Sequence, residues 1–173
     1  DLAKLRSPWL EALAGSLPPP QQQSFLANYR LVAPFRDPTL ELNLLAATGD
    51  EPELQALDVA DAIATGLDSG MGTYERMFAT LTLALTAGIE AGLTLLDLPK
   101  LLIDPSFRLN VVSRLPRGRT KEMLEPRLKG TPSATIQAIL ARLDRLTASR
   151  ISRQLLGAKG CFSWRDRLAR GVT

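Results

Sequence analysis

Arginine and lysine side chains in the last third of the chain form the set best suited to chemistry, and that chemistry is binding to phosphate. An arginine side chain presents a planar fork of N–H donors that fits a phosphate group, and a dense basic region favours polyanions. The alternative is that these side chains only solvate helix faces or pair with acidic neighbours elsewhere, and the sequence leaves both open. The candidates are Arg114, Arg117, Arg119, Lys121, Arg142, Arg145, Arg150 and Arg153.

The charge is unevenly divided along the chain. Residues 1–107 carry 6 basic and 14 acidic groups, whereas residues 108–173 carry 15 basic and 4 acidic groups, and the whole chain has a net charge of +3. A basic third joined to an acidic body predicts a surface that faces a polyanion. No segment has the base-reading side chains of a recognition helix, so we expect any DNA contact to be independent of sequence.

Other kinds of site are excluded or weak. The chain has no histidine and one cysteine, Cys161, which excludes a histidine-based catalytic or zinc site and a cysteine-rich metal site. It also lacks the Gly-x-x-x-x-Gly-Lys-Ser/Thr loop that cradles phosphates, so the chain alone is not expected to bind or hydrolyse ATP. The pairs Glu51/Glu53 and Asp58/Asp61 have the spacing of solvated helix surfaces. We therefore assign no catalytic residue, cofactor or metal site.

The elements that must position the basic residues are predominantly helices. With 173 residues, 45% of them apolar and 23% charged, the chain has the composition of a folded globular protein, and a cytoplasmic location is expected. The uncharged, largely apolar stretch at residues 77–89 is too short to span a bilayer. The fold class expected is mainly α, a multi-helix bundle. One or two short strands near the N-terminus, at 29–35 and around 40–44, would belong to an adjoining α/β core.

Apolar spacing places the main helices. A helix starting near Glu53 should bury Leu54, Leu57, Val59, Ala60, Ile63 and Leu67, and a helix over 73–91 should lie at the centre of the bundle. Thr120 is expected to cap a helix over 120–129, which Pro126 shortens or kinks, and Thr131 to cap the next helix. That helix buries Ile136, Ile139, Leu140, Leu143 and Leu146, and Ser149 marks a break before a shorter one.

Residues 94–115 predict two short helices in series. Asp97 caps the first, and Asp104 caps the second with Pro105 at its first position, where the missing N–H costs nothing. The apolar face of the first helix is Leu98, Leu101 and Leu102, and that of the second is Phe107, Val111, Val112 and Leu115.

The sequence of this stretch resembles that of a known protein family. Leu-Thr-Leu-Leu-Asp-Leu-Pro-Lys-Leu-Leu at 93–102, Asp-Pro-Ser-Phe-Arg at 104–108 and Val-Val-Ser-Arg-Leu at 111–115 are similar to a phrase of the HerA/FtsK-type P-loop ATPases. The most similar branch comprises the coupling-protein-like ATPases of conjugation and type IV secretion. Asn43-Leu44-Leu45 lies at the position where that family has an Asn-Pro-Leu-like motif, although Leu44 replaces the usual proline.

The resemblance implies an all-helical domain inserted between the Walker A and Walker B parts of a hexameric DNA-translocating motor. On this interpretation residues 1–47 are the edge of the motor core, 48–170 the inserted domain, and 171–173 the start of a Walker B strand. ATP and Mg²⁺ are implied only for the parent enzyme. The implied partners are DNA, the rest of the motor, further copies in a homo-hexamer, and adaptor or relaxase proteins.

A second hypothesis is a protein-interaction module without DNA binding. Its acidic half would dock an adaptor or a neighbouring subunit, and its basic third would pair with acids of the motor core. Charge reversal at Arg142 and Arg145 separates the two hypotheses, because only the first predicts DNA binding that such a change weakens. A stand-alone helical DNA-binding regulator is a third, weaker alternative, because the sequence contains no helix-turn-helix motif.

Overall fold

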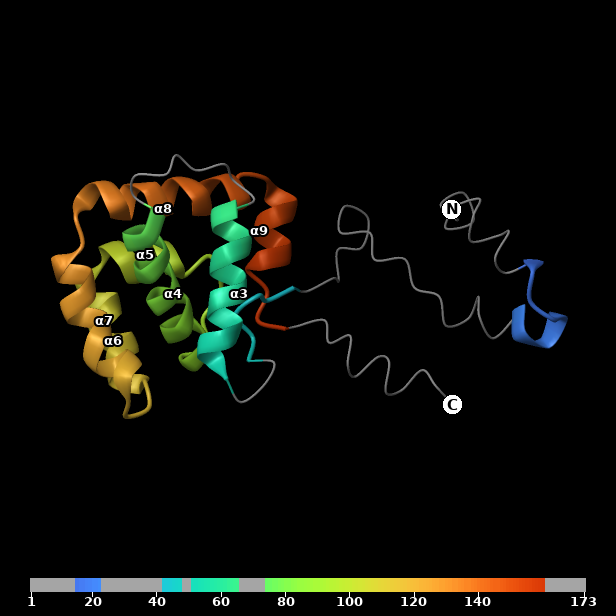
Figure 1. Cartoon of the computed structure of the whole chain (residues 1–173), viewed down its shortest axis with the longest axis horizontal. Coiled ribbons are helices and arrows are strands. Elements are labelled where there is room, and N and C mark those ends of the chain that lie inside the picture. The colour runs from blue at the N-terminus through green and yellow to red at the C-terminus, as the bar shows by residue number, and fades with distance from the viewer. Residues whose placement is uncertain (1–14, 23–41, 48–50, 66–73, 161–173) are drawn as a thin grey trace. The chain divides into compact units, whose positions relative to one another are not determined.

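The computed structural model of the chain describes residues 15–22, 42–47, 51–65 and 74–160 (Figure 1). Internal contacts divide the chain into two units, residues 1–37 with 163–173, and residues 38–162. In the described part of the first unit, the backbone N–H groups of Gln21 and Gln22 both donate to the carbonyl of Pro18, at 2.8 and 3.0 Å. These two bonds form a single helical turn, and the strand expected at 29–35 lies outside the described residues.

The described part of the second unit is helical, which confirms the mainly α fold class. The adjoining α/β core expected from the sequence remains a prediction. The unit includes residues 42–47, which the sequence analysis assigned to the preceding domain. Its helices are α3 (Pro52–Thr65), α4 (Tyr74–Glu90), α5 (Leu98–Ile103), α6 (Pro105–Arg114), α7 (Arg119–Gly130), α8 (Ser133–Leu146) and α9 (Arg150–Leu156).

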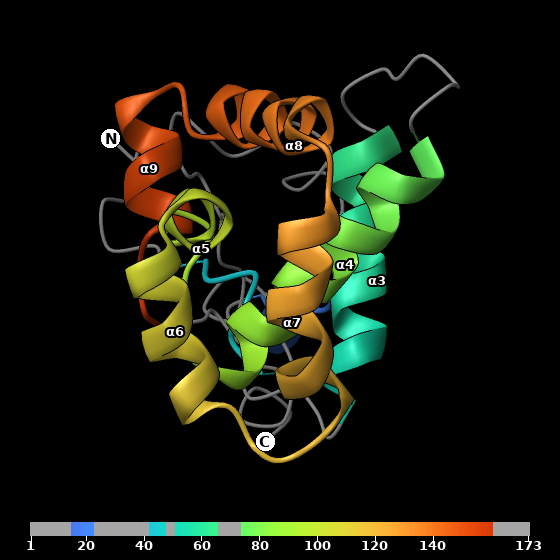
Figure 2. The same cartoon turned by 90° about the vertical axis from the view of Figure 1, so that its left-hand side faces the viewer.

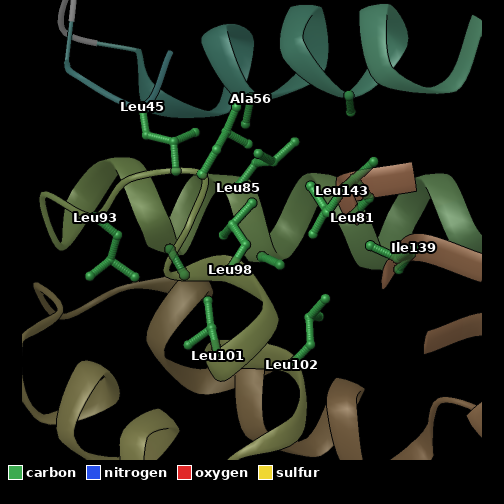
Figure 3. Packing of buried hydrophobic residues seen from close by; sticks show 14 of the residues in the cluster. Leu45, Ala56, Leu81, Leu85, Leu93, Leu98, Leu101, Leu102, Ile139 and Leu143 are labelled. Atoms are coloured by element: carbon green, nitrogen blue, oxygen red, sulfur yellow. The ribbon is translucent and has the colours of Figure 1, made fainter. Parts of the chain in front are cut away.

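Helix α4 is the central helix, as its sequence predicts. Helices α3, α5, α7 and α8 all pack against it (Figures 1 and 2). A helix that is apolar on most sides can bury nearly its whole surface only in this position. Figure 3 shows Leu81 and Leu85 of α4 meeting Leu98 of α5 and Leu143 of α8, and all four side chains are fully or almost fully buried.

Helix α3 packs on α4 through small residues, and here the predicted buried face is partly wrong. Ala56, Ala60 and Ala64 are buried, whereas Leu54 and Leu57 are 54% and 41% exposed. Three alanines at a spacing of four residues allow the helix axes to approach closely, so the small side chains occupy the interface and the leucines turn outward. Ile63 is buried as predicted, and Leu67 lies outside the described residues.

Residues 42–47 contain a turn at Leu44 and Leu45, preceded by a single bridge residue, Leu42, whose backbone N–H donates to the carbonyl of Leu155 at 3.1 Å. Within these residues, the alternation around 40–44 does not form the expected strand. Asn43 is buried; its Oδ1 accepts from the backbone N–H of Leu45 at 2.9 Å, and its Nδ2 donates to the carbonyl of Leu93 at 3.3 Å. Gln55 donates to the carbonyls of Leu44 and Ala46. A buried amide that satisfies backbone groups in this way fixes the turn against the bundle.

The predicted helix ends are confirmed at some positions and wrong at others. Gly92, after α4, has φ +65°, the left-handed conformation that favours glycine at a helix end. Gly118 rather than Thr120 is the N-cap of α7, and the helix continues through Pro126 to Gly130. Pro132 rather than Thr131 is the N-cap of α8, and the Thr131 hydroxyl donates backward to the carbonyl of Arg127. Ser149 caps α9 as a separate helix, which confirms the predicted break.

The described helices contain none that is both long and apolar enough to cross a membrane.

Candidate nucleic-acid interface

The α5–α6 elbow directs the chain toward the basic residues, and it forms as the sequence predicts. The carboxylate of Asp104 accepts from the backbone N–H groups of Ser106 and Phe107, at 2.9 and 3.1 Å, and Pro105 is the first residue of α6. The predicted side-chain cap by Asp97 is wrong: Asp97 occupies the N-cap of α5, but its Oδ2 accepts from the backbone N–H and hydroxyl of Thr94 instead of from the helix. Both aspartates therefore fix the entry to a helix, by different bonds.

Arg108 holds the elbow together from inside, a role that the sequence analysis missed. Its side chain is buried, and its Nε and Nη2 donate to the carbonyls of Leu101 and Leu102 at 3.0 and 2.7 Å. Its Nη1 lies 3.7 Å from Oε2 of Glu125 on α7. These carbonyls are at the C-terminal end of α5, where no helical donor is available for them. Arg108 thereby joins α5, α6 and α7, and it is unavailable to a ligand.

The α6–α7 basic cluster consists of Arg114, Arg117, Arg119 and Lys121, where α6 ends and α7 begins. The three arginines are exposed, and none of them forms an ion pair within the described part of the chain. Arg114 makes only a long 3.5 Å contact from Nε to the carbonyl of Asn110. Lys121 is half-buried and donates to the carbonyl of Leu115 at 3.0 Å, so its charge compensates the end of α6. Three guanidinium groups within six residues therefore remain open to an anion.

The α8–α9 basic cluster consists of Arg142, Arg145, Arg150 and Arg153, and its cations are more committed to their own fold. Nη1 of Arg153 donates to the carbonyls of Thr147 and Ala148, both at 2.9 Å, which satisfies the end of α8. Nη1 of Arg142 donates to the carbonyl of Ala138 at 2.9 Å. Arg145 and Arg150 are exposed. Bonding to carbonyls at a helix end is an ordinary structural use of arginine.

The fold divides the eight candidate residues between two places. Figure 2 shows the connection from α6 to α7 at one end of the bundle and the connection from α8 to α9 at the opposite end. The sequence predicted one basic region, because all eight residues lie in the same third of the chain. In the α6–α7 basic cluster, three exposed arginines that form no ion pair among the described residues lie within six positions of one another.

Glu90, the last residue of α4, is an acid in an unfavourable place. Burial raises the pKa of the Glu90 carboxyl above its usual range, and the neighbouring charge of Glu53 raises this pKa further. A hydrogen bond from the Thr120 hydroxyl to Oε1, at 3.3 Å, opposes the shift. The other carboxyl oxygen, Oε2, is buried and has no hydrogen-bond partner. The negative end of the α4 dipole adds to the cost of the charged form.

We expect the variant Glu90→Gln to become more stable, relative to the wild-type chain, as the pH rises. A raised folded-state pKa contributes stability below the unfolded pKa, and this contribution disappears as the pH rises through the folded value. Glutamine mimics the protonated acid and does not ionise, so the variant escapes that loss. Urea unfolding from about pH 4 to about pH 7 measures the difference. The control Glu75→Gln, on the exposed first turn of α4, should show no such gain, and an equal gain in both variants would contradict the assignment to Glu90.

The described residues contain no group of three or more histidine, cysteine, aspartate or glutamate side chains arranged to hold a metal ion. Cys161 lies outside them.

The chain matches no known family model, no curated protein sequence and no solved structure. The resemblance to the DNA-transfer ATPases therefore rests on the residues quoted above.

Proposed function

We propose that this chain is a helical domain of an ATP-dependent DNA translocase of the conjugation and type IV secretion kind, and that it contacts the DNA backbone without reading sequence. ATP would be bound and hydrolysed by parts of the parent protein outside this chain. The observation that supports the proposal best is the trio Arg114, Arg117 and Arg119, which is exposed, close in sequence and without ion pairs among the described residues. A planar guanidinium fork suits a phosphate group, and a non-specific contact needs nothing more.

The test is a fluorescence-anisotropy titration of a labelled DNA duplex, with the wild-type chain and the triple variant Arg114→Gln/Arg117→Gln/Arg119→Gln. If each arginine contributes about 0.5 kcal/mol, the triple variant should bind about 10-fold more weakly. Each lost phosphate contact should also lower the slope of log affinity against log salt by about 0.9. Titrations between about 50 and 200 mM salt give both quantities.

A matched control removes three exposed cations at other places, Arg76→Gln/Lys100→Gln/Lys159→Gln, and therefore lowers the net charge by the same amount. This control should keep the wild-type salt slope within experimental error. Equal losses in the two triple variants would mean that net charge alone controls binding, which contradicts a local interface. A wild-type chain that binds no DNA at low salt would end the proposal.

The second candidate function is a protein-interaction module without DNA binding, and exposed apolar residues favour it. Ile103, at the end of α5, is 58% exposed, and Leu109, on α6, is 59% exposed. Large exposed apolar side chains are enriched where proteins bind each other. Under this alternative the wild-type chain binds no DNA in the titration above.

A further inference from the structure

One exposed side of α3 carries an acidic row with an apolar centre. Glu53, Leu57 and Asp61 follow one another at intervals of four residues, so their side chains lie on the same side of the helix. All three are exposed, and Leu57 exposes 41% of its surface. We call these residues the α3 row.

One exposed side of α7 carries a row of the same spacing and the opposite charge. Arg119, Met123 and Arg127 also follow one another at intervals of four residues, all are exposed, and Met123 exposes 44% of its surface. In both rows the charged residues are eight positions apart, about 12 Å along a helix, with the apolar residue midway. We call these residues the α7 row.

The two rows do not satisfy each other within one chain. None of the four charged residues forms an ion pair among the described residues. Helices α3 and α7 both pack on α4, and α4 lies between them in Figure 1. Each row therefore presents two like charges and a bare apolar side chain to a partner.

We propose that the α3 row of one copy of this chain docks on the α7 row of a second copy. In that pairing Leu57 packs against Met123, and an arginine lies opposite each acid. Pairing two α3 rows or two α7 rows would place like charges opposite each other, so a two-fold axis that passes through either row is disfavoured. A head-to-tail contact leaves one row free at each end, and it builds a ring or an open series of copies. The proposal does not depend on DNA binding.

Charge matching also favours one relative direction of the paired helices. Asp58 follows Leu57 and Glu122 precedes Met123, so each acid lies about 100° round its helix from the centre of its row, in opposite senses. The two acids fall on the same side of the contact when the docked helices run parallel, and on opposite sides when they run antiparallel. Repulsion between the two carboxylates therefore favours the antiparallel pairing.

The test uses two variants of the full chain, each of which lacks one of the two rows. The replacement residues are uncharged, so they create no new ion pair. The first, Leu57→Gln/Asp61→Asn, removes the α3 row, and the second, Met123→Gln/Arg127→Gln, removes the α7 row. All four positions are exposed, so folding should be retained, and Arg119, which also belongs to the α6–α7 basic cluster, is unchanged. Sedimentation velocity without DNA, up to about 1 mM chain, suits the weak affinity expected of a small interface.

We expect the wild-type chain to increase in average mass with concentration, beyond that of a dimer, and each variant alone to remain monomeric. An equimolar mixture of the two variants should form a dimer and stop there, because one intact α3 row meets one intact α7 row and no further contact is possible. A monomeric wild-type chain would overturn the proposal and leave the α3 row to a basic helix of a different protein. Self-association that persists in both variants would also overturn it.

Discussion

Replacing Arg108 with methionine is expected to lower the free energy of unfolding by about 2–4 kcal/mol. Methionine keeps much of the apolar stem of the arginine but donates no hydrogen bond. The carbonyls of Leu101 and Leu102 then lose their donor, and they are too deeply covered by the elbow for water to replace it without rearrangement. The charge of Glu125 also loses its partner at 3.7 Å. Urea unfolding followed by circular dichroism measures the change.

Two further variants show which of these bonds matters. Glu125→Gln should cost at most about 1 kcal/mol. The Oε2 atom of Glu125 is buried but lies 3.7 Å from Arg108, beyond hydrogen-bond distance, and Oε1 pairs with the exposed Lys129 at 3.0 Å. Arg108→Lys should recover only part of the loss, because one ammonium group does not reproduce a fork aimed at two carbonyls. If Glu125→Gln destabilised the chain as much as Arg108→Met, the ion pair rather than the carbonyl bonds would hold the elbow.

The position of Arg108 could have been found in the sequence. Positions 108, 111, 112 and 115 have the spacing of one helical face, and three of the four residues are the valines and the leucine that were predicted to be buried. An arginine on an apolar face either breaks the pattern or finds partners inside. The sequence does not specify these partners, because they are backbone carbonyls of another helix.

The helices themselves were largely predictable, because α4, α5 and α6 have clear apolar faces and recognisable ends. The orientation of α3 was not, since an apolar pattern ranks leucine above alanine as a buried residue. The deciding factor is the distance between the axes of α3 and α4, which is a tertiary property. Where that distance is short, small residues occupy the interface, and Leu54 and Leu57 are then exposed to solvent.

The candidate interface was predictable in composition but not in place. Eight cations within forty positions look like one surface when only their order is known. The fold puts α7 and α8 between the two groups, and it commits Arg142, Arg153 and Lys121 to backbone carbonyls. Which arginines are left for a phosphate therefore depends on where helices end, and single-residue patterns define helix ends poorly.

Replacing Leu98 with alanine is expected to destabilise the chain by about 3–5 kcal/mol, because the change opens a cavity where α5 meets α4. Leu98 is fully buried and packs beside Gly88, where an added β-carbon would lie 3.4 Å from its Cδ2 (Figure 3). The absence of a side chain at Gly88 lets Leu98 approach the α4 backbone, so few neighbouring atoms can move in to fill the space. Leu109→Ala, at a position that is 59% exposed, is the matched control and should change stability by less than about 0.5 kcal/mol. Urea unfolding of both variants measures the contrast. Similar small losses for both would mean that α5 is not packed on α4 as described, and the elbow that carries α6 to the basic cluster would then have no fixed base.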